Sequence, residues 1–325
     1  MELSIVTTLY RSEAYVDPFY ARATRAAAQV TTDYEIVFVN DGSPDASLDR
    51  VLQIIARDPR VRVLDLSRNF GHHFALSAGL DAARGQRVFM IDSDLEEDPE
   101  WIEQFWKEMD QSGADVVYGV QTARSGSFLS VFPARLFYKL FNFMSEVRIA
   151  ADACTVRLMS RRYVEALLSL RDKALFLAGT SAWTGFDQRP VPVNKQQRRG
   201  LSSYGLLRKV ELFVRAATSF TAYPLKLIFL LGILISLLGM VLGTWLVLKK
   251  LVDPDSVLMG YASTMASLWF VGGVIITFLG VIGIYLSTVF TELKDRPPYV
   301  VRAFHGGERP VAGAGPLPRG GEDRT

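Results

Sequence analysis

The sequence has almost no cysteine, no large excess of charge of either sign and no leader-like start. Cys154 is the only cysteine in 325 residues, which excludes an intrachain disulfide and a cysteine-rich zinc site. The formal net charge is only +2, so the whole chain is not a polybasic nucleic-acid binder, and no nucleic-acid partner is expected. Met1-Glu2 lacks the positive start of a signal peptide, and we expect a first β-strand there instead.

Strand and helix patterns alternate over residues 1–120. The predicted strands are apolar throughout and are separated by helices, which indicates a parallel sheet covered on both faces. Polar clusters follow the strands, at the carboxyl ends where open α/β sheets bind ligands. We therefore expect an α/β fold with strands at 3–7, 35–39, 61–66 and 87–91 and helices at 16–30, 46–57 and 74–84.

Periodicity is weaker between residues 122 and 204. Helices are predicted at 131–144 and 161–169 from their apolar spacing. The stretch 190–203 is polar and basic, and we expect a loop there.

Two long apolar runs, 227–248 and 265–290, contain no Asp, Glu, Lys or Arg. Each is long enough to cross a hydrocarbon core, so two membrane spans are predicted. The alternative is a pair of buried core helices, which seldom run this long without a polar face. Glycines in both runs allow close helix packing within a hairpin or between protomers, and a homo-oligomer is one expectation. These glycines are Gly239, Gly243, Gly272, Gly280 and Gly283.

The segments around the apolar runs predict how the chain sits in a membrane. Charged and apolar residues mix over 206–220, which is typical of an amphipathic helix on a membrane surface. An ordinary surface helix is the alternative. Lysine and arginine are in excess before the first run and after the second, whereas the connecting loop has only Lys249 and Lys250, offset by Asp253 and Asp255. This difference places both termini in the cytoplasm. The end of the chain is rich in Gly, Pro and charge, and we expect it to be flexible.

The strongest chemical motif is Asp92-Ser93-Asp94, directly after a predicted strand. Two carboxylates at this spacing can meet one hard cation such as Mg²⁺ or Mn²⁺. A nucleotide diphosphate needs such an ion to offset the charge on the leaving group. Surface acidic loops also produce Asp-x-Asp, but the position at a strand end favours a functional site.

Two further polar motifs follow predicted strands. Asn40-Asp41-Gly42-Ser43 offers a carboxylate that can accept hydrogen bonds from a base or ribose, although this pattern alone is more often a turn. Arg68 begins Arg-Asn-Phe-Gly-His-His and can bind phosphate. The paired histidines are more typical of polar loop residues than of metal ligands. One crevice can gather all these strand ends.

Together these stretches resemble glycosyltransferase family 2, in the branch that contains dolichol-phosphate mannose synthase and bacterial polyprenyl-phosphate glycosyltransferases. The resemblance extends over about residues 3–290, and its motifs are highly specific as a set. The matching stretches are 5–10 with Glu13, 39–43, 68–72, 92–100, Asp152 with 156–158, and 199–204.

The resemblance implies a Rossmann-like GT-A domain and a sugar donor linked to UDP or GDP. It implies that the acceptor is a polyprenyl phosphate, undecaprenyl or dolichyl, held at a lipid bilayer, and that the product serves cell-envelope glycan or glycolipid assembly. The implied organisation is a cytoplasmic transferase domain at 1–204, an amphipathic segment at 205–224, a two-helix transmembrane hairpin at 225–290 and a flexible tail at 291–325. The protein is then an integral, multi-pass protein of the inner (cell) membrane.

The resemblance also assigns roles to individual residues. The nucleoside is expected to contact Thr7, Tyr10, Glu13 and Asp41. The metal and diphosphate are expected at Asp92 and Asp94, with Glu96, where the family often has Gln, also facing the metal. Basic residues for phosphates fall at Arg124, Arg135 and Arg199. The sequence departs from the family at His72, often Gln or Lys, and at Gln121, often Arg.

The acceptor's chemistry predicts the mechanism. A phosphate monoester is mostly dianionic near pH 7, so it needs no base to remove a proton. Attack opposite the leaving diphosphate inverts the anomeric carbon. Five cations can hold the acceptor phosphate and the donor diphosphate together: Arg124, Arg135, Lys139, Arg198 and Arg199. The strongest candidates are Arg135 and Arg199. Asp152 lies where related alcohol-using enzymes place a base.

Two other functions use the same residues differently. A processive polysaccharide synthase of the same fold usually has more spans and a Gln-x-x-Arg-Trp motif, but Gly200 follows Gln196 to Arg199 here. A non-catalytic membrane scaffold is disfavoured by the intact Asp92 and Asp94.

Overall fold

The computed structural model describes residues 1–121, 153–170, 177–195, 223–252, 261–294 and 296–307. These residues divide into two compact units. Everything described up to residue 195, together with 296–307, belongs to the first unit, and two long helices make up the second. The predicted helix at 131–144 and the amphipathic segment at 206–220 lie outside the described residues.

The first unit is built on a mixed eight-stranded sheet in the order β7-β5-β6-β4-β1-β2-β3-β8. The strands are β1 (Leu3–Leu9), β2 (Tyr34–Asn40), β3 (Val61–Leu66), β4 (Arg87–Met90), β5 (Val116–Gln121), β6 (Ala153–Ser160), β7 (Gln188–Val193) and β8 (Val301–His305). The parallel pairing predicted for the first four strands is confirmed. By contrast, β6 and β8 run antiparallel to their neighbours, so the sheet is not parallel throughout.

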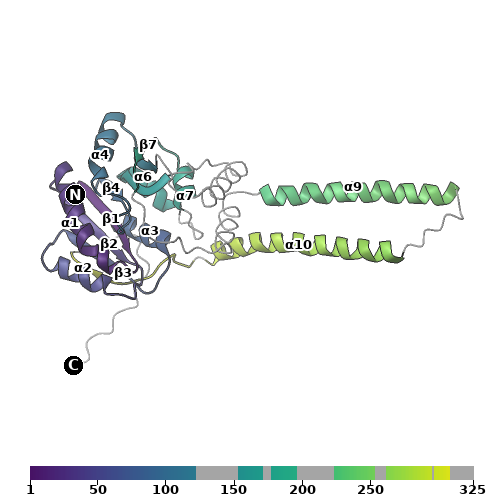
Figure 1. The fold of residues 1–325 in the computed structure, drawn as a ribbon, viewed down its shortest axis with the longest axis horizontal. Coiled ribbons are helices and arrows are strands. Elements are labelled where there is room, and N and C mark those ends of the chain that lie inside the picture. The colour runs from purple at the N-terminus through teal and green to yellow at the C-terminus, as the bar shows by residue number, and fades with distance from the viewer. Residues whose placement is uncertain (122–152, 171–176, 196–222, 253–260, 295, 308–325) are drawn as a thin grey trace, which may run out of the picture. The chain divides into compact units, whose positions relative to one another are not determined.

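Helices cover both faces of this sheet (Figure 1). The first face packs against α1, α2 and α4 through residues such as Phe19, Ile54 and Phe105. The second packs against α3 and α6 through residues such as Leu76 and Tyr163. The helices of this unit are α1 (Glu13–Val30), α2 (Ser47–Ile55), α3 (His72–Ala82), α4 (Trp101–Ser112), α6 (Arg161–Ser169) and α7 (Leu177–Trp183).

The prediction of a loop over 190–203 is wrong for its first residues, because β7 continues to Val193 and pairs with β5 in parallel. Val191 and Val193 are buried while Arg189, Pro190 and Pro192 are exposed, which is the alternation of a strand with one face on the core. Two prolines obscure the pattern in the sequence. They are tolerated because β7 is at the edge of the sheet.

The prediction of a flexible tail from residue 291 is wrong for residues 301–305. This segment is β8, which extends the sheet antiparallel to β3. Its register pairs Leu64 with Phe304 and Leu66 with Val301. A short strand of this kind gains its stability from the edge that it covers, which no local sequence pattern reveals.

The second unit consists of α9 (Tyr223–Val252) and α10 (Tyr261–Leu293), which contact each other. Among the described residues, one helical segment, Phe270–Leu293, is long and apolar enough to cross a membrane, and Leu225–Ile235 is a shorter apolar segment. A Cβ placed on Gly272, Gly280 or Gly283 would meet no atom within 4 Å. Among the described residues, no neighbour packs closely against these three glycines, and two spans remain a prediction.

Candidate active site

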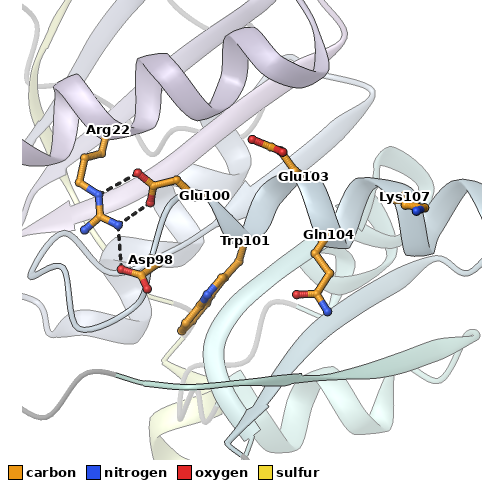
Figure 2. Close-up of a pocket in the computed structure, with 7 residues that line it drawn as sticks. All are labelled: Arg22, Asp98, Glu100, Trp101, Glu103, Gln104 and Lys107. Atoms are coloured by element: carbon orange, nitrogen blue, oxygen red, sulfur yellow. Dashed lines mark hydrogen bonds and ion pairs between the residues drawn. The ribbon is translucent and has the colours of Figure 1, made fainter.

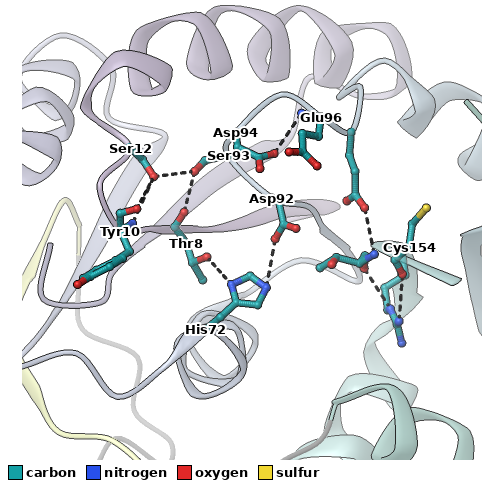
Figure 3. Close-up of polar contacts among 12 residues, drawn as sticks. Thr8, Tyr10, Ser12, His72, Asp92, Ser93, Asp94, Glu96 and Cys154 are labelled. Carbon is teal, nitrogen blue, oxygen red and sulfur yellow. Dashed lines mark hydrogen bonds and ion pairs between the residues drawn. The ribbon is translucent and has the colours of Figure 1, made fainter. Parts of the chain in front are cut away.

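The carboxyl ends of β1 and β4 meet at a group of polar side chains (Figure 3). His72, at the start of α3, bridges them. Its Nδ1 lies 3.1 Å from Thr8 Oγ1, and its Nε2 lies 3.3 Å from Asp92 Oδ1. That Asp92 oxygen is shielded from solvent and has no hydrogen-bond donor within the described part of the chain, although His72 is near it. An acceptor left open in this way suits a cation or a ligand donor.

The Asp-x-Asp turn is held by its middle residue. Ser93 is buried, and its hydroxyl donates to the Thr8 carbonyl oxygen at 2.8 Å. Asp94 then accepts from the Glu96 amide at 3.1 Å, and Leu95 takes a left-handed conformation with φ of 60°. Such a conformation is costly for a residue with a Cβ and persists only where surrounding contacts require it. The turn thus presents Asp92 and Asp94 on a fixed backbone.

Glu97 and Lys195 form a charged pair behind this turn. The buried Glu97 accepts from the Thr155 amide at 3.1 Å. Lys195 Nζ lies 3.6 Å from Glu97 and 3.3 Å from Glu96. Burial, reinforced by the Asp92 carboxylate, raises the pKa of Glu97 to about 7. The surrounding carboxylates outweigh burial at Lys195 and raise the pKa of its ammonium group.

Among the described residues, carboxylates outnumber cations at this edge. Asp92, Asp94, Glu96 and Glu97 lie within six consecutive positions. His72 lies near Asp92, and Lys195 lies near Glu96 and Glu97. Hard oxygen donors of this kind fit Mg²⁺ or Mn²⁺. Within the described ranges, no three His, Cys, Asp or Glu side chains form a ready-made metal cluster.

The strand-end motif at Asp41 links two loops of the structure, and its predicted contact with a nucleoside stays a prediction. The buried Asp41 carboxylate accepts the Phe70 amide at 2.7 Å and the Gly71 amide at 3.0 Å. Burial raises its pKa despite these bonds. Gly42 has φ of 61°, and a Cβ there would lie 2.5 Å from the Asn69 nitrogen. The Asp41 carboxylate therefore links the loop after β2 to the loop after β3.

The other predicted nucleoside and phosphate residues are spread along this edge. Thr7 is fully buried, while Tyr10 is exposed. Glu13 lies 3.7 Å from Arg50, and its amide donates to Asp45 at 3.0 Å. The Arg68 guanidinium stacks 4.0 Å from the centre of the Phe70 ring. Thr8, rather than Thr7, thus belongs to the group of side chains around Asp92.

Several predicted residues lie outside the described part of the chain: Arg124, Arg135, Lys139, Asp152, Arg198 and Arg199. Conversely, sequence reasoning missed Thr8, Ser93, Glu97 and Lys195. Alternation along β1 indicates that Thr7 and Thr8 face opposite ways, but not which of them faces the site. Lys195 is far from Asp92 in sequence and carries no motif, so only the pairing of β7 with β5 brings it near.

An open pocket of about 590 Å³ lies beside α1 and α4 and contains none of the strand-end residues discussed above (Figure 2). Arg22 reaches from α1 to Asp98 at 2.7 Å and to Glu100 at 2.9 Å. These carboxylates follow the Asp-x-Asp turn in the sequence, so Arg22 ties the end of that turn to α1. Arg22, Asp98 and Glu100 are thus paired with one another, and their contacts link α1 to the segment before α4. The residues that line the pocket are Arg22, Asp98, Glu100, Trp101, Glu103, Gln104 and Lys107.

The fold and the acidic strand end together define an α/β enzyme that handles a phosphorylated ligand. Residues 4–168 match the Glycosyl transferase family 2 domain. The chain belongs to this family and is a glycosyltransferase of the Rossmann-like GT-A type, as the sequence motifs predicted.

Relatives of nearly the same length support this membership. The chain is 42% identical to "Putative glycosyltransferases" of Mycobacterium tuberculosis over 95% of this chain and 90% of the relative. It is 33% identical to the "Bactoprenol glucosyl transferase" of Shigella phage SfII, over 94% of this chain and 99% of that one. Among solved structures, S. aureus TarS in complex with UDP-GlcNAc is 17% identical, with a TM-score of 0.45 over 66% of each chain.

Proposed function

We propose that this protein transfers a sugar from a nucleotide-sugar donor to a polyprenyl phosphate, with inversion at the anomeric carbon and with a divalent metal ion. The observation that carries the proposal is the fixed turn at Asp92 and Asp94, around which the described residues supply more carboxylates than cations. Such a site has affinity for a divalent cation, and a cation there suits a diphosphate leaving group. Proteins named bactoprenol glucosyl transferase align with nearly the whole chain, apolar helices included.

The proposed reaction forms one bond and breaks one. A phosphate oxygen of the acceptor attacks the anomeric carbon, the bond from that carbon to the diphosphate oxygen breaks, and the nucleoside diphosphate leaves. A bound Mg²⁺ or Mn²⁺ would neutralise the charge on the leaving group. Asp92 and Asp94 would hold it, and His72 would fix the orientation of Asp92 through its contact with Thr8. No proton needs to be removed from a dianionic acceptor.

One assay with the purified full-length protein tests the reaction. A panel of radiolabelled UDP- and GDP-sugars is offered with undecaprenyl phosphate, and label in the lipid fraction is measured with Mg²⁺, with Mn²⁺ and with excess EDTA. We expect one donor to label the lipid only when a divalent ion is present, and NMR of the product to show the anomeric configuration opposite to that of the donor. Labelling that persists in EDTA, or a retained configuration, contradicts the proposal.

The acceptor side rests on residues outside the described part of the chain. We propose that Arg135 and Arg199 bind the acceptor phosphate, with Arg124, Lys139 and Arg198 as further candidates. Arg135→Ala or Arg199→Ala should then raise the acceptor KM by at least about tenfold. Asp152→Asn should retain substantial kcat because no base is required. A folded, donor-binding Asp152→Asn variant without activity would show that a base is needed after all.

The membrane arrangement is part of the same proposal. We propose that α9 and α10 both span the bilayer, that the α/β unit and both termini are cytoplasmic, and that protomers associate. Reporter fusions at residue 256 and at the C-terminus should report opposite sides of the membrane. If both report the cytoplasm, a two-span hairpin is wrong. Crosslinking in lipid that yields only monomers contradicts self-association.

A further inference from the structure

The chain returns to the α/β unit after α10, and the returning segment contacts the loops of the candidate site. β8 closes the edge of the sheet at β3. Just before β8, the Val300 carbonyl oxygen accepts the Ser67 amide at 2.9 Å. Ser67 precedes the loop that carries Arg68 to Gly71. The last strand of the sheet therefore lies directly beside one of the two loops after β2 and β3.

Arg302 is the one side chain of β8 that the described contacts connect to a strand-end motif of the site. Its Nε donates to Asp65 Oδ2 at 2.7 Å and its Nη2 donates to Asp65 Oδ1 at 3.0 Å. Asp65 has only 4% of its side chain exposed, whereas Arg302 has 57%. This two-pronged contact is the geometry in which arginine fixes a carboxylate most firmly.

Asp65 is connected to the loop after β2 through the side chain of Asn40. Asn40 Nδ2 donates to Asp65 Oδ1 at 2.8 Å, and Asn40 Oδ1 accepts the Ser43 amide at 3.1 Å. The side chain of Asn40 is buried, so it has no water to replace these partners. Arg302, Asp65, Asn40 and Ser43 thus form a continuous chain of hydrogen bonds from the last strand to the turn at Asp41 and Gly42.

The same turn is locked to the loop after β3. Asp41 accepts the Phe70 and Gly71 amides, and Gly42 packs against the backbone of Arg68 and Asn69. A shift of Asn40 would therefore move both loops. In open α/β sheets these strand-end loops are where a nucleotide binds.

We propose that Arg302 is a positioning residue for the donor nucleotide, acting through Asp65 and Asn40 on the loops at 41–43 and 67–71. The inference rests on the proposed function for the identity of the ligand, but the hydrogen-bond chain is a property of the fold alone. It gives the segment after the apolar helices a role in donor binding, in addition to closing the edge of the sheet.

A neighbouring residue supplies a matched control. Tyr299 is buried and donates from its hydroxyl to Asp81 on α3 at 3.2 Å. Tyr299→Phe removes one buried hydrogen bond from the same returning segment without touching Asp65 or Asn40. If the returning segment only covered the edge of the sheet, Tyr299→Phe and Arg302→Ala would have the same effect on nucleotide binding and on amide exchange.

The test measures binding and local exchange in the full-length protein. UDP and GDP, each with Mg²⁺, are titrated into wild type, Arg302→Ala, Arg302→Lys and Tyr299→Phe. We expect Arg302→Ala to raise the Kd of the nucleotide that wild type binds by about tenfold, the scale of loss when a residue that orients a binding group is removed. Arg302→Lys should raise the Kd less than Arg302→Ala, because an ammonium group restores the positive charge but cannot form the two-pronged contact with Asp65. Tyr299→Phe should change the Kd by less than about twofold.

Hydrogen exchange separates failure of this inference from failure of the proposed function. In the nucleotide-free protein, Arg302→Ala should speed amide exchange at Ser43, Phe70 and Gly71 by about tenfold, and Tyr299→Phe should not. Unchanged exchange in Arg302→Ala, or equal effects of the two variants, overturns the positioning role. If wild type binds neither nucleotide while the exchange difference is present, the proposed function is wrong.

Discussion

The two ends of the central strands carry two clusters of charged side chains, one buried and one partly exposed, that differ in how carboxylates and cations are matched. At the amino ends, Glu35 accepts from Ser4, from Arg62 and from the Arg84 amide, and Arg62 also lies 4.7 Å from the centre of the Phe304 ring. One carboxylate meets one guanidinium here: Arg62 donates from Nη1 to Glu35, whereas its Nε and Nη2 have no hydrogen-bond partner among the described residues. At the carboxyl ends, the described residues place four carboxylates between Asp92 and Glu97, where His72 lies near Asp92 and Lys195 lies near Glu96 and Glu97.

The difference shows which cluster is structural and which is functional. At the amino ends one buried carboxylate is matched by one buried guanidinium, and losing either partner leaves an unpaired charge. A cluster with surplus carboxylates is destabilised by mutual repulsion until a cation arrives. Removing a carboxylate should therefore cost stability at the amino ends and cost activity at the carboxyl ends.

The largest expected effect is at the carboxyl ends. Asp94→Asn should lower the rate of sugar transfer by at least about 10³-fold, because it removes charge stabilisation at the leaving group. Circular dichroism and the unfolding midpoint should match wild type. Asp98→Asn is the matched control, since it makes the same change four residues later on a carboxylate that pairs with Arg22; its rate should stay within about threefold of wild type. Wild-type activity in Asp94→Asn would show that the carboxyl-end cluster is not the functional one.

At the amino ends, Glu35→Ala should lower the free energy of unfolding by about 3–5 kcal/mol, because it leaves the buried Arg62 without its partner. Denaturant unfolding of the purified protein measures this. Glu35→Gln keeps hydrogen-bonding atoms for Ser4 and the Arg84 amide and should lose less. A Glu35→Ala variant as stable as wild type would mean that the amino-end cluster is not structural.

Glu97 should make the stability of the metal-free protein depend on pH. Its pKa is raised from 4.5 to about 7 by burial and by Asp92. Between these values the folded protein binds a proton that the unfolded chain has released. The free energy of unfolding should therefore fall as the pH rises from about 4.5 to about 7, and this loss is complete above that range. Glu97→Gln should remove this part of the dependence in unfolding curves recorded with EDTA; identical pH profiles for the two proteins would contradict the assignment.

The smallest effect is expected at Arg22, which is paired on the surface. Its partners Asp98 and Glu100 are partly exposed, so Arg22→Ala should cost roughly 0.5–1 kcal/mol of stability. Transfer activity should stay within about twofold of wild type at saturating metal. A much larger loss of activity with unchanged stability would assign Arg22 to the functional cluster.

Local sequence patterns predicted much of the α/β unit. The apolar runs that became β1 to β4 and the helix at Arg161–Ser169 are where the pattern indicated, because a buried strand and an amphipathic helix are set by local composition. Asp92 and Asp94 were identifiable for the same reason, since the end of an apolar strand is visible in the sequence. The prediction failed where a segment takes its conformation from a distant edge, as β7 and β8 do.

By itself, the sequence determined the order of the first strands and helices, the acidic turn at Asp92 and the apolar character of α9 and α10, since each depends on residues close together in the chain. Only the tertiary structure decided that Thr8 rather than Thr7 meets His72, that Asp41 fastens two loops, and that Arg302 returns to Asp65. These contacts join residues as many as 237 positions apart. Their formation depends on which strands become neighbours, and that is decided by burial over the whole sheet rather than by any local pattern.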